Sequence, residues 1–269
     1  MSQTARAEAF HQLHTGPEVL ILPNAWDVAS AVIVADAGAK AVATTSAAVA
    51  WVLGFADGDR LPVDHTCALA AAITRAVDLP LTVDFEGGFT DDLDELSANI
   101  AKVIAAGAVG INFEDGGRDP KLHATKIAAA RQAAEKAGVA LYINARTDVY
   151  LKGLATGDAA EAEAVRRAKL YLSAGASGIF VPGAAEAALV GRLAAAIPAP
   201  LNILAWPGAP DAASLKALGV RRLSAGTGTF NVAAAALAQA TAAFLAEGSS
   251  DAIFAASKGA PALQKRFMA

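Results

Sequence analysis

Polar side chains that could do chemistry follow several short apolar runs of the sequence. Three sets are spaced two residues apart: Asp84 and Glu86, Asn112 and Glu114, and Asn144 and Arg146. Residues two apart on a strand point to the same side, so each pair would face one way. Three carboxylates in one place repel each other, and a hard divalent cation with oxygen ligands is the usual resolution. The pattern predicts a Mg²⁺ site, with Mn²⁺ as a substitute, held by Asp84, Glu86 and Glu114.

The types of residue that are missing from the predicted strand ends exclude other chemistries. None of His11, His14, His65, His123 and Cys67 follows a predicted strand, which favours Mg²⁺ or Mn²⁺ over Zn²⁺. No predicted strand contains a lysine, so a Schiff-base aldolase is disfavoured. The serines at strand ends have no histidine base beside them, which disfavours a serine nucleophile. Metal-assisted chemistry on an anionic substrate remains.

Other polar residues near strand ends complete the candidate set. Asp57 lies in the loop after the second predicted strand and is a catalytic candidate together with Glu114 and Arg146. Asn202, on the seventh predicted strand, is a candidate for substrate binding. These assignments rest on one rule: a (β/α)₈ barrel places its catalytic groups at the carboxyl ends of its strands.

The elements that must position these residues are eight short apolar segments, each followed by a segment with helical spacing. The predicted strands span residues 19–23, 41–45, 81–85, 109–113, 140–144, 178–181, 201–204 and 221–224. Glycine ends five of the intervening helices, where it accepts a left-handed backbone: Gly38, Gly107, Gly138, Gly175 and Gly219. No Gly-rich dinucleotide fingerprint follows the first strand, so a (β/α)₈ barrel is favoured over a doubly wound sheet.

The C-terminal part is longer than one barrel helix requires. Residues 230–247 predict one helix, and residues 249–268 predict an extra C-terminal helix. An extra helix of this kind either folds back on its own barrel or packs on a neighbouring subunit, even by exchange between subunits. We therefore expect a single barrel domain over residues 1–269 and a homo-oligomer, a dimer or a tetramer.

Composition narrows the class of partner. The 269-residue chain has a net charge of −4 with both signs scattered, so nothing indicates a nucleic-acid surface. No uninterrupted apolar run approaches the roughly 18 residues of a membrane span, so no membrane partner is expected. The N-terminal residues lack the pattern of a signal peptide, from which we expect a cytoplasmic protein. A small carboxylic acid is the expected partner.

Five motifs, in order along the chain, resemble those of the isocitrate lyase and phosphoenolpyruvate mutase superfamily. They occupy residues 44–48 (TTSAA), 53–58 (LGFADG), 84–88 (DFEGG), 113–115 (FED) and 145–148 (ARTD). The resemblance implies that Asp84 is nearest to Mg²⁺, with Glu86 and Glu114 joining directly or through water. It implies that the turn of Ser46, Ala47 and Ala48 binds the substrate carboxylate with help from Arg146. Asp57 would lie close to the reacting centre.

The sequence departs from these relatives in two places. Family lyases that act on isocitrate or methylisocitrate carry a cysteine in the loop after the fourth strand, whereas residues 115–123 contain none. The mutases have an asparagine in that loop and a histidine near the end of strand six, and here residues 115–123 contain no asparagine and residues 181–183 read Val-Pro-Gly. The resemblance then implies a Mg²⁺-dependent lyase or decarboxylase that cleaves a C–C bond of a small 2-oxo or 2-hydroxy di-acid through an enolate.

Three alternatives stay open. The first is P–C bond chemistry, as in a phosphonopyruvate hydrolase or a phosphoenolpyruvate mutase. The second is a phosphate-binding barrel isomerase, because residues 224–229 (SAGTGT) follow the eighth strand, where many barrels bind phosphate. The third is a protein that only binds an acid. Gly116 and Gly117 are in addition either the hinge of a lid that would carry Arg118, Lys121 or His123 inward, or part of an ordinary exposed loop.

Overall fold

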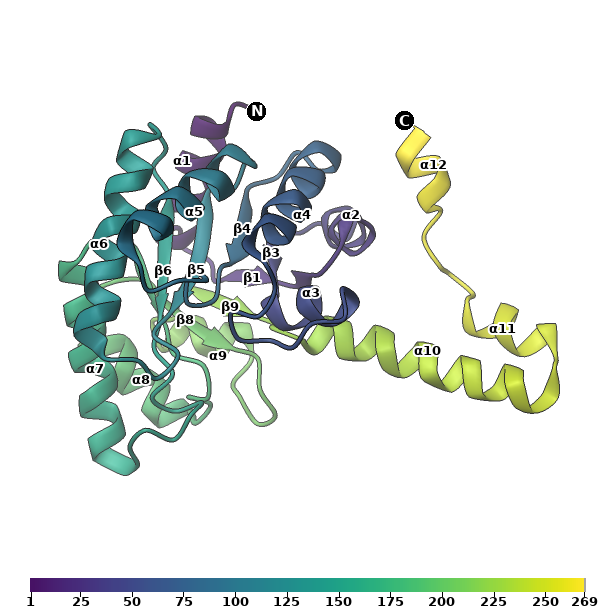
Figure 1. Ribbon diagram of the computed structural model, residues 1–269. Coiled ribbons are helices and arrows are strands. Elements are labelled where there is room, and N and C mark those ends of the chain that lie inside the picture. Colours follow the sequence, from purple (N-terminus) through teal and green to yellow (C-terminus); the bar gives the residue numbers. More distant parts are fainter. Residues whose placement is uncertain (269) are drawn as a thin grey trace.

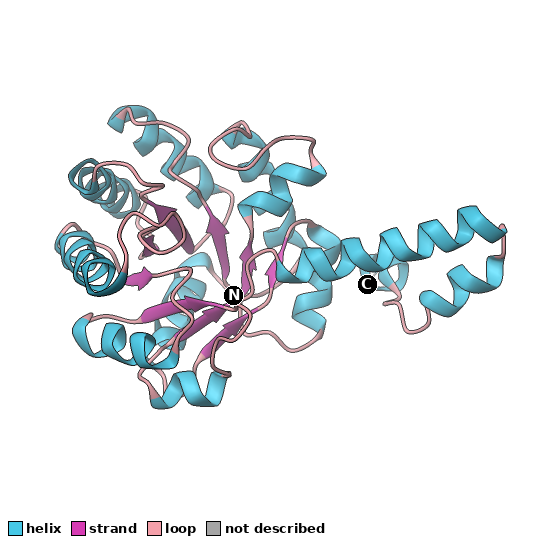
Figure 2. Cartoon of the chain, turned by 90° about the horizontal axis from the view of Figure 1, so that it is seen from below, coloured by secondary structure: helices cyan, strands magenta, loops and turns pink. Residues whose placement is uncertain are grey.

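The strands of the computed structural model, which describes residues 1–268, are parallel and follow the order β1-β9-β8-β7-β6-β5-β4-β3-β2. Their bounds are β1 Leu20–Leu22, β2 Asn24–Ala25, β3 Val42–Thr44, β4 Leu81–Asp84, β5 Gly110–Glu114, β6 Tyr142–Arg146, β7 Gly178–Phe180, β8 Leu201–Leu204 and β9 Arg222–Ser224. Only Pro23 separates β1, which pairs with β9, from β2, which pairs with β3. The two therefore act as one strand that closes a barrel, as Figure 2 shows from below.

Each of the eight predicted strands overlaps an observed one, and the predicted (β/α)₈ barrel is confirmed. The first predicted strand ends at Pro23, after which the structure adds β2, because proline has no N–H to donate to a neighbouring strand. All five glycines expected after helices have positive φ, between 70° and 108°. The sequence pattern was sufficient here because each βα unit repeats the same local signals.

Helices surround the barrel on its outer side (Figure 1). Their bounds are α1 Gln3–Thr15, α2 Val28–Asp36, α3 Ser46–Val52, α4 Val63–Ala76, α5 Leu93–Ala105, α6 Pro120–Lys136, α7 Gly157–Ser173, α8 Ala187–Ala196, α9 Ala212–Ala217, α10 Gly228–Glu247, α11 Ser250–Ala256 and α12 Leu263–Met268. Aspartate side chains at the start of several helices accept from first-turn N–H groups, for example Asp92 from Glu95 N at 2.8 Å.

Helix α1 closes the end of the barrel at which the strands begin. Its Phe10 and His14 rings pack on Tyr142 of β6, with ring centroids 5.5 Å and 3.8 Å away. His14 Nδ1 lies 2.8 Å from the carbonyl oxygen of Phe10. Burial, and next the charge of Arg222, lower the pKa of His14 to about 3. The imidazole is therefore neutral inside this plug.

The barrel interior contains a layer of polar side chains where many barrels place branched apolar ones. Arg222 is fully buried and donates to Asn112 Oδ1 at 3.0 Å and to Ser224 Oγ at 3.1 Å. Asn112 Oδ1 also accepts from Asn144 Nδ2 at 2.9 Å. Burial lowers the pKa of Arg222 to about 10, so the guanidinium is still charged at neutral pH. These contacts join β5, β6 and β9 beneath the carboxyl ends of the strands.

Helix α10 extends away from the barrel instead of covering it, and α11 follows at its far end (Figure 1). Helix α12 returns toward α2, where Arg266 Nε lies 3.3 Å from Asp36 Oδ1. No residue of α10 is buried, although its 20 residues are long and apolar enough, with a mean hydropathy of 1.4, to pass a length and composition test for a membrane span. The single helix predicted over residues 249–268 is wrong: α11 and α12 are separate. Gly259, with φ of 89°, and Pro261 lie between them and interrupt the helical path.

Candidate active site

Asp84 is the last residue of β4, and the end of β3 fixes its carboxylate. Its Oδ2 accepts from Ser46 N and from Ser46 Oγ, both at 2.9 Å, and its own N–H donates to Thr44 Oγ1 at 2.8 Å. Its other oxygen, Oδ1, is buried and has no partner among residues 1–268. A buried carboxylate oxygen without a donor is costly unless a cation or water meets it, so Asp84 is oriented to bind one.

Glu86 does not continue the strand, and this corrects the expectation that Asp84 and Glu86 share one strand face. β4 ends at Asp84, and the backbone of Glu86 is left-handed with φ of 48°. Its Oε2 accepts from Gly58 N at 2.8 Å and from Asp59 N. Burial is the main reason that the pKa of Glu86 is raised to about 7, against the lowering effect of the bond from Asp59. Glu86 thus holds the loop that carries Asp57.

Glu114 and Arg146 form an ion pair across the ends of β5 and β6. Arg146 Nη1 lies 2.5 Å from Glu114 Oε2, and Arg146 Nε lies 2.6 Å from Asp148 Oδ1. The two strands hold them in direct register. Burial raises the pKa of the Glu114 carboxyl, while Arg146 opposes the shift. Burial alone would lower the pKa of Arg146, but the two carboxylates outweigh it and the net shift is upward.

The three predicted metal ligands, Asp84, Glu86 and Glu114, differ in their contacts. In the described part of the chain, no three His, Cys, Asp or Glu side chains are grouped so as to hold a metal ion. The reason is local: Glu86 is bonded to the backbone of the loop 57–59, and Glu114 is bonded to Arg146. Of the three, Asp84 has an oxygen that is buried and has no partner among residues 1–268. This still fits Mg²⁺, which commonly binds proteins through one or two carboxylates and keeps several waters.

Asp57 and Asp59 belong to the loop between α3 and α4. Partial burial, and next the charge of Asp84, raise the pKa of Asp57, which places it near that carboxylate. Asp59 Oδ1 accepts from Gly87 N at 3.0 Å, and its Oδ2 lies 2.6 Å from Arg118 Nη2. The structure therefore brings Asp57, Asp84, Glu114 and Arg146 to the same mouth, with Asp59 as a link between loops.

The candidate substrate-binding residues lie at different depths in the barrel. Ser46 is near the mouth, but its N–H and hydroxyl are bonded to Asp84. Ala47 and Ala48 follow it in the first turn of α3, where backbone N–H groups have no acceptor within the helix. Asn202 lies one layer deeper than the mouth: it is 1% exposed, and its Oδ1 accepts from Ser224 Oγ at 3.2 Å. The last residue of β8 is Leu204, two positions further on.

The loop after β5 is tied to its neighbours in this structure. Arg118 contacts Asp59 and, at 3.3 Å, Asp91. Lys152 Nζ donates to the carbonyl oxygen of Gly116 at 2.7 Å. His123 cannot be carried inward by a hinge at 116–117, because it belongs to α6 and is fully buried, with its Nε2 3.2 Å from the Phe113 carbonyl oxygen. Burial lowers the pKa of His123 to about 4, so it is neutral.

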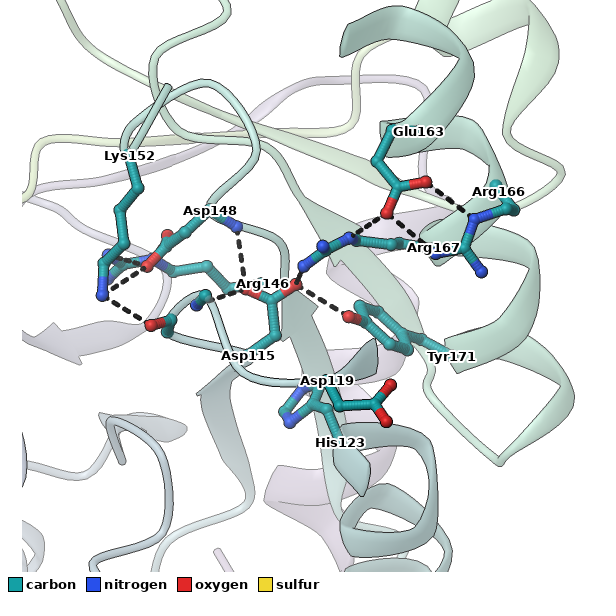
Figure 3. A network of polar contacts seen from close by, with 12 residues as sticks. Asp115, Asp119, His123, Arg146, Asp148, Lys152, Glu163, Arg166, Arg167 and Tyr171 are labelled. Atoms are coloured by element: carbon teal, nitrogen blue, oxygen red, sulfur yellow. Dashed lines mark hydrogen bonds and ion pairs between the residues drawn. The ribbon is translucent and has the colours of Figure 1, made fainter. Parts of the chain in front are cut away.

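A buried network around Asp115, shown in Figure 3, was not recognised from the sequence. Asp115 Oδ2 accepts from Arg167 Nη1 at 2.8 Å and from Tyr171 Oη at 2.7 Å. Its Oδ1 accepts from Asp148 N at 3.1 Å. These partners are 52, 56 and 33 residues away in the chain. The sequence alone shows only that Arg167 and Tyr171 are four residues apart. Asp115 fixes Asp148, and through it the guanidinium of Arg146.

The family described as phosphoenolpyruvate phosphomutase matches residues 10–245. An uncharacterized protein of Mycobacterium tuberculosis is 36% identical over 236 residues, covering 86% of this chain and 87% of that protein. The 2-methylisocitrate lyase of Bacillus subtilis is 30% identical, covering 74% of this chain and 67% of the lyase.

A solved structure from Burkholderia cenocepacia, assigned provisionally as a phosphonomutase, is also similar. It is 42% identical and superimposes with a TM-score of 0.83, covering 87% of this chain and 98% of that one. Structures of oxaloacetate acetylhydrolase and of 2,3-dimethylmalate lyase superimpose with TM-scores of 0.82 and 0.81. At 21% and 23% identity these two indicate a shared fold alone.

Proposed function

Because this chain belongs to the phosphoenolpyruvate phosphomutase family, within a superfamily of lyases and mutases, we propose that it is a Mg²⁺-dependent enzyme that cleaves a C–C bond. Its substrate is a small 2-oxo or 2-hydroxy di-acid in the cytoplasm, and the reaction is that of a lyase or decarboxylase. The observation that carries the proposal is the free Oδ1 of Asp84 beside the Glu114–Arg146 pair.

Each residue of the mouth would have its own role in such a reaction. Arg146 donates to the oxygens of the 2-oxo acid, where its charge favours the build-up of negative charge. Mg²⁺ held by Asp84, directly or with Glu86 and Glu114 through water, would supply positive charge to the same oxygens. The backbone of Ser46, Ala47 and Ala48 contacts the substrate carboxylate.

Proton transfer falls to carboxyl groups because the loop after β5 has no cysteine. In a decarboxylation, the electron pair of the broken C–C bond stays on the 2-oxo acid as an enolate. In the cleavage of a 2-hydroxy di-acid, the hydroxyl proton passes to a base, a 2-oxo acid is released, and the electron pair stays on the other carboxylic acid as its enolate. In both cases a proton must then reach carbon. Asp57 and Glu114 both have raised pKa values, caused first by burial, so each retains a proton to a higher pH than an exposed acid. We assign the proton donor to this pair.

The substitution Asp84→Asn tests the proposal with little change in shape, since the amide oxygen can still accept from Ser46. We expect turnover to fall by at least about a thousandfold and Mg²⁺ binding to be lost, because the charged ligand is removed. The measurement is release of the 2-oxo acid with and without EDTA, which is pyruvate from oxaloacetate and from 2-methylated malates and glyoxylate from malate. Mg²⁺ titration by calorimetry measures the binding of the metal. Full activity of the wild type in EDTA would contradict the proposal.

P–C bond chemistry is the second candidate, favoured by the 42% identity to the provisional phosphonomutase. Phosphonopyruvate separates the two: a hydrolase would release phosphate and pyruvate, whereas a mutase would form phosphoenolpyruvate. The barrel isomerase finds less support, because Gly226 N and Thr229 Oγ1 in the segment after β9 are already bonded to Asn24.

We also propose that the protein is a homo-oligomer, a dimer or a tetramer, in which the α10 arm of one subunit covers another. Ile21 on the outer side of β1 is 53% exposed, and no residue of α10 is buried. A mainly apolar groove of about 710 Å³ lies beside it, lined by parts of β1, α1 and α2. Apolar side chains are exposed both on the arm and on the part of the barrel that the arm does not cover. A second copy of the chain is the partner that would cover both surfaces.

A further inference from the structure

The guanidinium of Arg146 is oriented by a two-point contact with Asp148. Its Nε and Nη2 lie 2.6 Å and 3.2 Å from the two carboxylate oxygens of Asp148, a residue that is fully buried. Because the N–H groups of a guanidinium form a rigid fork, this contact also sets the direction of Nη1, which meets Glu114 at the mouth. The position of Asp148 therefore decides where Arg146 can meet a substrate.

Asp115 fixes the backbone on both sides of this contact. Its N–H donates to the carbonyl oxygen of Arg146 at 3.1 Å, and its Oδ1 accepts from the N–H of Asp148 at 3.1 Å. Asp115 is itself fully buried, and its Oδ1 also accepts from Gly117 N at 3.3 Å. One residue of the loop after β5 thus clamps the backbone where β6 ends.

Two donors on helix α7 set the direction of the Asp115 carboxylate. Its Oδ2 accepts from both Tyr171 Oη and Arg167 Nη1, as Figure 3 shows. Tyr171 is fully buried, and its ring meets the His123 ring edge-on with centroids 4.8 Å apart. Arg167 in turn donates to Glu163 Oε1 at 2.7 Å. A helix on the outer side of the barrel is therefore connected to the mouth by buried hydrogen bonds.

We propose that Arg167 and Tyr171 are positioning residues for the substrate, although both belong to the outer helix α7. They act through Asp115 on the end of β6 and so hold the Arg146 guanidinium where a substrate carboxylate meets it. The inference rests on the proposed function, because it takes Arg146 to bind the 2-oxo acid. A group displaced by about 1 Å can cost about a hundredfold in activity. Loss of either donor should therefore weaken substrate binding and leave Mg²⁺ binding at Asp84 unchanged.

Oxalate is a suitable probe, because it is a planar di-anion with the same pair of neighbouring oxygens as a 2-oxo acid. Calorimetric titration of the full chain measures the binding of oxalate in the presence of Mg²⁺ and, separately, the binding of Mg²⁺ alone. Tyr171→Phe keeps the ring beside His123 and removes one donor to Asp115, so oxalate should bind about fivefold more weakly. Arg167→Met removes the charged donor and should weaken oxalate binding at least about tenfold. Both proteins should bind Mg²⁺ as the wild type does.

Two controls separate positioning from a general effect on folding. Tyr150→Phe removes a buried hydroxyl in the loop after β6 that has no partner among residues 1–268, and it should leave oxalate binding unchanged. In an Arg146→Lys protein, whose oxalate binding is already weakened, Tyr171→Phe should have less than about a twofold further effect, because residues of one network are not additive. Denaturant unfolding shows that each variant is folded under the conditions of the titration.

The outcomes separate this inference from the proposed reaction. Unchanged oxalate binding in folded Tyr171→Phe and Arg167→Met proteins, equal losses of oxalate and Mg²⁺ binding, or the full effect of Tyr171→Phe in the Arg146→Lys protein would each overturn the positioning role. A wild type that does not bind oxalate would overturn it as well. If the variants behave as expected while none of the di-acids is cleaved, the positioning role stands and the proposed C–C cleavage is wrong. Cleavage by the wild type with oxalate binding that does not depend on Tyr171 would leave the proposed function intact.

Discussion

At the scale of single residues, the candidate site depends on carboxylates that differ in how they are satisfied. Asp84 keeps one oxygen free, Glu86 is bonded to a loop backbone, and Glu114 is paired with Arg146. All three were predicted as metal ligands, with Asp84 nearest to Mg²⁺ and with Glu86 and Glu114 joining directly or through water. The structure distinguishes them through their partners, and the unpaired oxygen of Asp84 is buried.

Asp115 provides a prediction at the same scale. Asp115→Asn should lower the free energy of unfolding by about 3 kcal/mol, because an amide N–H₂ would face Arg167 and Tyr171 and leave a buried guanidinium without its counter-charge. Chemical denaturation measures the change. Glu163→Gln is the matched control: Glu163 pairs with Arg166 and Arg167 at a more exposed position, so its loss should cost about 1 kcal/mol or less. Equal effects of the two substitutions would contradict a special role for the buried carboxylate.

At the scale of elements, positions in the site are fixed by neighbours in space. The end of β3 orients Asp84, the loop 57–59 receives Glu86, and α7 anchors the loop after β5 through Asp115. Strand alternation did not predict the direction of the Glu86 side chain, because β4 ends at Asp84 and the backbone of Glu86 is left-handed. The rule of alternation is reliable only where strand pairing continues.

Helix α1 leads to a prediction about pH. The pKa of His14 is about 3 in the folded state, below the ordinary value of 6.5 that the unfolded chain would show. The unfolded state therefore binds more protons between these values, and stability should fall as pH decreases from about 6.5 toward 3, by up to about 1.4 kcal/mol per pH unit. His14→Phe keeps a ring against Tyr142 and should flatten this dependence. Denaturant unfolding at several pH values measures it, with exposed His65→Gln as the control; an unchanged slope in His14→Phe would be the contrary result.

At the scale of the whole molecule, the barrel and the α10 arm are built differently. The barrel contains the buried apolar core, whereas α10 has no buried residue and exposes Leu237, Phe244 and Leu245. Such an arm needs another surface to cover it, and the bare outer side of β1 offers one on a second copy. The exposed apolar side chains of α10 and the exposed side of β1 are therefore the basis of the proposed oligomer.

The prediction is that Leu237→Arg combined with Leu245→Arg shifts the protein toward monomers, since each charge would be buried without a partner in the interface. Light scattering coupled to size-exclusion chromatography measures the mass, and we expect the wild type to elute as a dimer or a tetramer. Gln132→Arg on the exposed side of α6 serves as the surface control. A wild-type monomer would contradict the proposed assembly.

The sequence by itself determined the eight strands, the glycines after the helices and the clustering of Asp57, Asp84, Glu114 and Arg146 at one end of the barrel. These follow from local signals that repeat in each βα unit and from the rule that parallel strands end on one side. The tertiary structure alone decided which partner each carboxylate has, that Asn202 lies below the mouth, that Asp115 is a buried anchor and that α10 leaves the barrel. Each of these depends on contacts between residues far apart in the chain, whose side-chain partners no local pattern specifies.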